Sequence, residues 1–191
     1  MPASDPRRVA GAVLAAGSGT RMGTPKSELI VDGVRLLDRA VDALRSAGCN
    51  PVIAVVRKQT HVLDARVVVN GEPERGMRSS LALAVEAAAG YDALAVILVD
   101  VPGIGAGAIR TVIDAWRPGR IAIGRIGDRR THPTVMAGAL WKEALLHAGP
   151  DEGARTLMAA RGDLIDAVDV QGNADDLDTP EDLEQWQRRN A

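Results

Sequence analysis

The stretch Val13–Lys26, with the sequence VLAAGSGTRMGTPK, constrains the fold more than any other part of the chain. The apolar run from Val9 to Ala16 predicts a buried first strand. Three glycines follow it closely, Gly17, Gly19 and Gly23. Because glycine has no Cβ, such a turn can bend sharply and bring its backbone close to a ligand. We therefore expect a first strand that leads directly into a ligand-binding turn.

Two cations in the same turn indicate the kind of ligand. Arg21 and Lys26 place a guanidinium and an ammonium beside backbone N–H groups that can face an anion. A dinucleotide fingerprint requires the spacing G-x-G-x-x-G and a later acidic residue, and a Walker loop requires a lysine directly after its last glycine. Here Lys26 follows Gly23 by three residues, so neither motif matches. The turn predicts a polyphosphate clamp of another kind.

An ordinary surface turn with solvated cations is the alternative interpretation. The order of residues from Leu14 to Lys26, L-A-A-G-x-G-x-R-M-G-x-x-K, argues against it. This order resembles the signature of the nucleotidyltransferase superfamily that includes the molybdenum cofactor guanylyl- and cytidylyltransferases. The resemblance implies that the turn binds a nucleoside triphosphate, with Arg21 and Lys26 on the β- and γ-phosphates. The implied nucleotide-binding residues of the turn are Leu14, Ala15, Ala16, Gly17, Gly19, Arg21 and Lys26.

Length and composition favour a single cytoplasmic domain. We expect one domain over residues 9–191 of the 191-residue chain, after a flexible polar segment at residues 1–8. A net charge of -2 and an aromatic content of 2% disfavour nucleic-acid binding. Cys49 is the only cysteine, so we expect no internal disulfide, a packing role for this thiol and a reducing compartment. The apolar stretch after the first residues is too short for an export signal or a membrane span.

Apolar runs and helical patterns alternate along the chain. This alternation predicts a three-layer α/β/α fold with a mostly parallel, Rossmann-like sheet. The predicted strands are residues 9–16, 52–56, 66–70, 94–99, 120–124, 134–137 and 164–170. The predicted helices are residues 36–44, 81–88, 109–116, 140–145, 152–160 and the segment from 180 onward. Either Ser79 or Ser80 is expected to cap the second helix, and Thr179 the last.

Asp100 ends the most hydrophobic predicted strand and is the first candidate metal ligand. Ligands of such sheets bind beyond the carboxyl ends of the strands, where the clamp is also expected. Mg²⁺ prefers one or two carboxylates together with substrate phosphates, so an aspartate that faces the clamp is chemically sufficient. The alternative is an aspartate that only caps the following turn.

Asp176 and Asp178 are the candidates for a second metal ligand. Their alternative role is an acidic approach to the N-terminus of the last helix. In the resembled superfamily, a residue directly before a T-P-E-D-L segment joins the strand-end aspartate at the metal. Asp178 directly precedes that segment here. The resemblance therefore implies that Asp100 and Asp178 hold Mg²⁺.

Residues 76–81, GMRSSL, resemble the G-M-x-x-S-L element of the cytidylyltransferase branch. The resemblance implies that Ser79 and Ser80 lie beside the nucleotide, where hydroxyls and free N–H groups at a helix start can bind it. An ordinary serine cap is the alternative.

Two later segments resemble elements on the acceptor side of the same branch. Residues 131–133 read THP and resemble its G-H-P segment, while residues 151–155 read DEGAR and resemble its G-D-x-G-A-R segment. This implies that His132 and Arg155 contact the acceptor. A structural or exposed histidine is the alternative for His132.

These features predict a magnesium-dependent nucleotidyltransferase with Arg21, Lys26 and Asp100 as catalytic residues. An acceptor phosphate attacks the α-phosphorus of a nucleoside triphosphate in line and pyrophosphate leaves, without a protein nucleophile. The resemblance favours molybdopterin as the acceptor, and Ala16 in L-A-A-G favours CTP over GTP. One alternative is a sugar-phosphate or alcohol-phosphate nucleotidyltransferase. Another is a non-catalytic nucleotide-binding protein that inserts a cofactor into a partner such as a molybdoenzyme.

Overall fold

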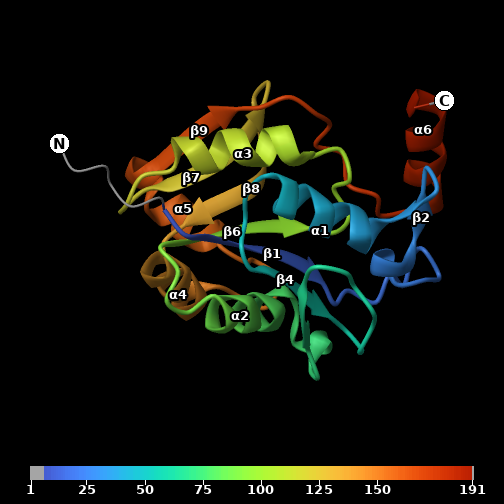
Figure 1. Ribbon diagram of the computed structural model, residues 1–191, viewed down its shortest axis with the longest axis horizontal. Coiled ribbons are helices and arrows are strands. Elements are labelled where there is room, and N and C mark those ends of the chain that lie inside the picture. Colours follow the sequence, from blue (N-terminus) through green and yellow to red (C-terminus); the bar gives the residue numbers. More distant parts are fainter. Residues whose placement is uncertain (1–6, 191) are drawn as a thin grey trace.

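The computed structural model describes residues 7–190, so most of the predicted flexible segment 1–8 lies outside the described residues. Its central feature is a seven-stranded sheet with helices on both faces (Figure 1). Within the described range no helix combines the length and the apolar character that crossing a bilayer requires. The predicted three-layer α/β architecture is confirmed.

The chain alternates between strands and helices as expected. The strands are β1 (Val9–Ala15), β2 (Ile30–Val31), β3 (Val34–Arg35), β4 (Val52–Val56), β5 (Arg66–Val69), β6 (Ala93–Leu98), β7 (Ile121–Ile126), β8 (Arg129–Met136) and β9 (Ile165–Asp169). The α-helices are α1 (Leu36–Ser46), α2 (Met77–Ala87), α3 (Ala106–Ala115), α4 (Gly138–His147), α5 (Arg155–Ala160) and α6 (Pro180–Asn190). Short 3₁₀ turns are η1 (Lys26–Glu28), η2 (Pro73–Arg75) and η3 (Gly162–Leu164).

The large sheet has the strand order β5-β4-β1-β6-β8-β7-β9, and β2 and β3 form a separate hairpin. All neighbouring strands of the large sheet are parallel except β8, which runs antiparallel to both β6 and β7. The predicted strand at 134–137 is therefore part of a longer one, because β8 begins at Arg129 and pairs with β7 across a tight turn. The centrally placed β1 and β6 end side by side, which brings the turn after β1 next to Asp100.

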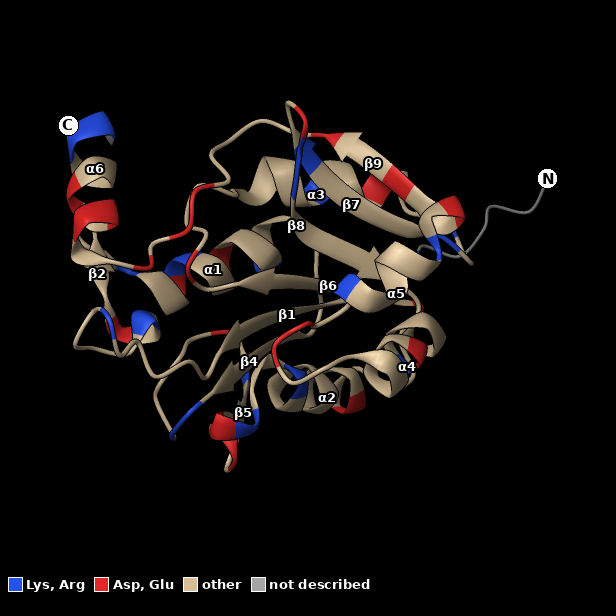
Figure 2. Ribbon diagram, turned by 180° about the vertical axis from the view of Figure 1, so that it is seen from behind, with Lys and Arg blue, Asp and Glu red and all other residues tan. Residues whose placement is uncertain are grey.

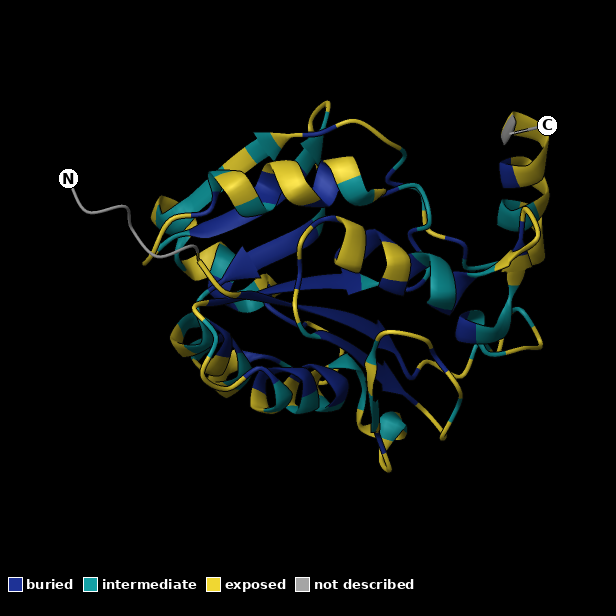
Figure 3. Cartoon of the chain, viewed as in Figure 1, coloured by how far each residue is buried: buried dark blue, intermediate teal, exposed yellow. Residues whose placement is uncertain are grey.

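Side chains of β1 alternate between two hydrophobic cores, as a strand covered on both faces requires. Val9, Val13 and Ala15 face the core under α1 and α3, whereas Ala10, Ala12 and Leu14 face the core over α2, α4 and α5. Figure 3 shows the central strands as the most buried part of the fold. The sheet therefore holds the ends of β1 and β6 rigidly.

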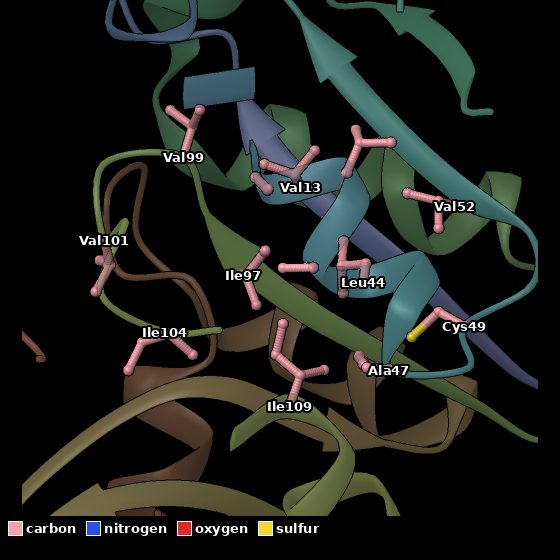
Figure 4. Close-up of a cluster of buried hydrophobic side chains, with 14 of the residues drawn as sticks. Val13, Leu44, Ala47, Cys49, Val52, Ile97, Val99, Val101, Ile104 and Ile109 are labelled. Carbon is pink, nitrogen blue, oxygen red and sulfur yellow. The ribbon is translucent and has the colours of Figure 1, made fainter. Parts of the chain in front are cut away.

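Cys49 lies within the first of these cores, beside Leu44 and Val52 (Figure 4). A Cβ on Gly11 would come within 2.8 Å of the Cys49 Cβ, so the close approach of this segment to β1 requires glycine there. Burial raises the pKa of the Cys49 thiol to about 12. The expected packing role of this cysteine is confirmed.

Two local predictions are wrong. The helix expected at 152–160 begins only at Arg155, because Gly153 adopts a left-handed φ of 55° that a helix cannot contain. Helix α2 begins at Met77 rather than after a serine cap, because Gly76, with φ 83°, takes the N-cap position. The carboxylate Oδ1 of Asp151 accepts a hydrogen bond from the Met77 N–H at 3.2 Å.

Helix α6 begins as predicted. The Thr179 hydroxyl accepts a hydrogen bond from the Asp182 N–H at 3.3 Å, and Asp182 Oδ2 accepts one from the Thr179 N–H at 2.8 Å. This reciprocal pair is a capping box. The helix stands at the side of the sheet to which β1 and β6 point (Figure 1), where Trp186 Nε1 donates to Asp32 Oδ2 at 3.1 Å. The segment before α6 is thereby held near the carboxyl ends of the strands.

Candidate functional site

The turn after β1 closes on itself. The Met22 N–H donates to the Gly19 carbonyl at 2.9 Å, and Gly19 has a left-handed φ of 62°. A Cβ on Gly19 would lie 2.0 Å from the Thr24 carbonyl oxygen, so the fold of the turn requires glycine at this position. A Cβ on Gly17 would meet no atom of the described structure within 4 Å. Gly17 therefore leaves open space that a ligand can approach.

A cavity of about 530 Å³ lies between this turn, the ends of β1 and β6, and the start of α2. It brings together seven of the predicted residues: Leu14, Ala16, Gly17, Gly19, Lys26, Ser80 and Asp100. The Ala15 side chain instead lies in the core and is only 2% exposed. Ser79 lines a neighbouring hollow on the outer side of α2. The sequence thus located the cavity but assigned two side chains that face away from it.

Lys26 joins the two predicted metal ligands. Its Nζ donates to Asp100 Oδ2 at 2.7 Å and also to Asp178 Oδ1. Lys26 begins η1, Asp100 follows β6, and Asp178 precedes α6, so three distant parts of the chain meet at one ammonium. Burial lowers the pKa of Lys26, but the hydrogen bonds and charges of the two carboxylates outweigh it and hold the pKa above its usual value. The lysine is therefore charged at neutral pH.

Hydrogen bonds of the backbone bring the segment of Asp178 next to Asp100. The Leu177 N–H donates to the Asp100 carbonyl oxygen at 2.8 Å, and the Leu177 side chain is buried at 1% exposure. The Asp178 N–H donates to Asp182 Oδ2 at 3.0 Å, in the cap of α6. Figure 2 shows the acidic segment that leads into α6. Asp100 and Asp178 are thus positioned by hydrogen bonds of their own main chain.

The donor set fits a hard divalent cation. Asp100 Oδ1 is buried and has no hydrogen-bond partner among the described residues. Two carboxylates suit Mg²⁺, which takes its remaining ligands from phosphates and water. Residues 7–190 contain no group of three or more histidine, cysteine, aspartate or glutamate side chains placed to hold a metal.

The remaining candidates near the carboxylates lie further from Lys26. Arg21 is 75% exposed, and its Nη1 is 4.0 Å from Asp178 Oδ2. Asp176 forms an ion pair with Arg129 at 3.3 Å. Asp178 is thus the aspartate of this segment that meets Asp100 at Lys26, and Arg21 is an exposed cation beside Asp178.

Asn70 is a site residue that the sequence analysis missed. Its side chain is buried at 2% exposure, and its Nδ2 donates to Ser79 Oγ at 2.8 Å and to Ser80 Oγ at 2.9 Å. Its Oδ1 accepts the Glu72 N–H at 3.0 Å. Asn70 follows β5 directly, and a polar residue at the end of a strand is the same signal that identified Asp100. Both serine hydroxyls therefore accept hydrogen bonds from a residue at the end of a sheet strand, and neither serine caps α2.

A second cavity of about 400 Å³ adjoins the first, and the two share Leu14, Met77, Leu98 and Asp151. The predicted acceptor residues His132 and Arg155 both line it. His132 comes from β8 and Arg155 begins α5, which lies beside α4 on the same face of the sheet. The structure therefore brings these two residues together next to the cavity that the glycine turn lines.

His132 is expected to make stability depend on pH. Burial lowers the pKa of its imidazole, although the charge of Asp100 opposes this. The unfolded chain then takes up a proton near pH 6.5 while the folded chain resists it, so the free energy of unfolding falls as the pH falls below that value. Replacing His132 with Asn should flatten this dependence in urea unfolding between pH 7 and 5. An unchanged slope would contradict a neutral, buried imidazole.

Comparison with known proteins places the chain. Residues 11–165 match the model of the MobA-like NTP transferase domain. The nicotine blue oxidoreductase of Paenarthrobacter nicotinovorans is 30% identical over 192 residues, which cover 92% of this chain and 94% of that protein. A probable molybdenum cofactor guanylyltransferase of Opitutus terrae is 38% identical over 127 residues, or 63% of this chain and 61% of that protein.

Solved structures share the fold at lower identity. Rv0371c of Mycobacterium tuberculosis H37Rv has a TM-score of 0.83 at 24% identity, covering 96% of this chain and 100% of that one. Its complex with manganese has a TM-score of 0.76 at 23% identity, covering 95% and 98%. The 2-C-methyl-D-erythritol 4-phosphate cytidylyltransferase of Thermus thermophilus has a TM-score of 0.70 at 22% identity, covering 95% and 98%. With the glycine turn and the match over residues 11–165, the chain belongs to the MobA-like NTP transferase domain family.

Proposed function

We propose that the protein transfers a nucleoside monophosphate, preferably from CTP, to a phosphorylated acceptor, preferably molybdopterin, and releases pyrophosphate. Membership of the family makes the chain a nucleotidyltransferase domain. The observation that carries the proposal is Lys26, which lines the cavity of the glycine turn together with Asp100 and also contacts Asp178, a residue of the adjoining hollow. Cations and carboxylates at one cavity are what a triphosphate and a divalent cation together require.

In this proposal each residue has a positioning or an electrostatic role. Lys26 and the exposed Arg21 hold the β- and γ-phosphates and stabilise the departing pyrophosphate. Asp100 and Asp178 would hold Mg²⁺, which when bound neutralises phosphate charge. Asn70 fixes Ser80 on the wall that α2 contributes to the cavity. The acceptor phosphate then attacks the α-phosphorus of the nucleoside triphosphate in line, from the side of the second cavity, and pyrophosphate leaves. No protein nucleophile is needed.

The second cavity supports a ring-shaped acceptor over a sugar phosphate. Its floor is formed by apolar side chains, including Leu81, Val96, Ile123, Trp141 and Met158. Hydroxyls of a polyol buried against such a floor would lose their hydrogen bonds to water without replacement. The exposed cations Arg130 and Arg155 line the same cavity and can meet an anionic group, although the exposed carboxylates of Asp151 and Glu152 line it too. A flat heterocycle with a phosphate, such as molybdopterin, matches this combination.

The relatives differ in what their names state, so the reaction must be tested directly. One is named as a guanylyltransferase, one structural neighbour as a cytidylyltransferase and one relative as an oxidoreductase. The oxidoreductase name does not direct our proposal, because the glycine turn lacks the dinucleotide spacing. For CTP over GTP the support is Ala16, which lines the nucleotide-side cavity.

The test is a screen of the four nucleoside triphosphates against molybdopterin and against sugar phosphates, with pyrophosphate release as the measurement. We expect release with CTP and molybdopterin above all other pairs. Release with GTP would correct the nucleotide, and release with a sugar phosphate would correct the acceptor. Tight nucleotide binding without release from any pair would instead favour a nucleotide-binding accessory protein that serves a molybdoenzyme.

A further inference from the structure

We infer that Lys26 acts as an internal counterion that excludes the divalent cation until a triphosphate draws it away, so that metal and nucleotide bind interdependently. This inference rests on the proposed function, because it assigns Asp100 and Asp178 to the metal. It concerns the order in which the same site is filled, which neither the family nor the names of the relatives specify.

The Lys26 ammonium lies between the two proposed metal ligands. One atom, Lys26 Nζ, is within hydrogen-bonding distance of Asp100 Oδ2 and of Asp178 Oδ1. The carboxylate oxygens that would bind a cation therefore already converge on a cation. Lys26 and Asp100 are mostly buried, with side chains 17% and 20% exposed, so water screens this contact only partly. A divalent ion that approached while the ammonium stayed would meet its repulsion.

Exchange of the Lys26 ammonium for a metal ion requires one of these charged groups to move. Hydrogen bonds fix the main chain at both aspartates, from Leu177 N–H to the Asp100 carbonyl and from Asp178 N–H to Asp182. The backbone of Lys26 is also fixed, because its carbonyl accepts the Leu29 N–H at 3.2 Å. The four-carbon stem of Lys26 is the flexible part. Exchange can therefore occur by rotation of the lysine side chain, without movement of the main chain at either aspartate.

A bound triphosphate would attract the Lys26 ammonium away from the carboxylates. Lys26 lines the same cavity as Gly17, Ser18, Gly19 and Thr20, so a triphosphate bound by the turn would lie within that cavity. Its anionic oxygens then compete with the two carboxylates for the ammonium. When the ammonium turns to the phosphates, the carboxylates lose their counterion and regain affinity for a divalent cation. Each ligand thereby favours the other, and such coupling is reciprocal.

Direct binding of Mn²⁺, followed by the electron paramagnetic resonance signal of the free ion, tests the inference. Titrations are made with and without α,β-methylene-CTP, and binding of Mn²⁺ to the analogue alone is subtracted. We expect the wild-type protein to bind Mn²⁺ about tenfold or more tightly with the analogue than without it. Lys26→Gln should bind Mn²⁺ without the analogue about tenfold or more tightly than wild type, and should lose most of the coupling.

Lys142→Gln is the matched control, because it removes the same charge from an exposed position on α4. It should match wild type within about twofold, since exposed distant charges are screened. Thermal melting verifies that each variant is folded, and Lys26→Met provides a second neutral side chain. If wild type and both Lys26 variants bind Mn²⁺ equally tightly without the analogue, the exchange between ammonium and metal is overturned, whereas the proposed metal site is not. No Mn²⁺ binding by any variant under any condition would overturn the metal site, and with it this part of the proposed function.

Discussion

Lys26→Ala is expected to lower the rate of pyrophosphate release by about 10²–10³-fold, the loss typical of removing one preorganised electrostatic group. The physical reason is that the side chain is the best-placed cation of the turn. Its ammonium lies at the cavity and contacts both carboxylates, whereas Arg21 is 75% exposed. The measurement is steady-state release from CTP with molybdopterin. Circular dichroism must show that the variant is folded, because the change leaves Asp100 and Asp178 facing each other without a counterion.

Arg21→Ala provides the comparison. Its nearest carboxylate oxygen is 4.0 Å away, and an exposed ion pair of this kind contributes about 0–1 kcal/mol, so we expect a rate loss below about tenfold. The contrast between the two variants separates the largely buried cation from the exposed one. Wild-type rates in folded Lys26→Ala would remove Lys26 from the phosphate clamp. A larger loss in Arg21→Ala than in Lys26→Ala would reverse the assigned roles.

Gly19→Ala is expected to disrupt the turn and weaken binding of the triphosphate about tenfold or more, which corresponds to about 1.4 kcal/mol. A Cβ at this position lies 2.0 Å from the Thr24 carbonyl oxygen and also forces a side chain into φ 62°. The backbone must therefore move, and the N–H groups that face the ligand move with it. Nucleotide affinity is measured by calorimetry and the free energy of unfolding by urea titration.

Gly23→Ala separates strain from collision. Gly23 also has a left-handed φ, 69°, but a Cβ there meets no described atom within 4 Å. The free energy of unfolding of this variant should fall by only about 1–2 kcal/mol, the cost of placing a residue with a Cβ in the left-handed region. Gly19→Ala should lose more stability than Gly23→Ala and far more nucleotide affinity. Equal losses in the two variants would show that the collision with Thr24 is relieved without cost.

The sequence predicted those parts of the fold and site that depend on local pattern. Continuous apolar runs located the parallel strands, and the polar residue after the most apolar run located Asp100 at the edge where ligands bind. The Thr-Pro-Glu-Asp pattern located the start of α6. These signals are local because strand burial, helix spacing and capping each involve residues that are close in sequence.

Other features depend on contacts that no local pattern contains. Ser79 and Ser80 were expected as caps, but their partner is Asn70, which reaches them from the sheet. Asp151 directly precedes the helix expected at 152–160, but its carboxylate accepts a hydrogen bond from the N–H of Met77 at the start of α2. The ammonium that links Asp100 to Asp178 joins residues 74 and 152 positions from Lys26. Only the assembled sheet determines which of these side chains meet.

The hydrogen bond from Leu177 to Asp100 has a consequence for how the chain matures on the ribosome. The glycine turn, Lys26 and Asp100 are synthesised well before residues 177 and 178, which also lie outside the matched range 11–165. A nascent chain can therefore form most of its sheet while only one of the two carboxylates is in place. In the proposed metal site, the second carboxylate therefore joins Asp100 only when the segment before α6 docks against the end of β6.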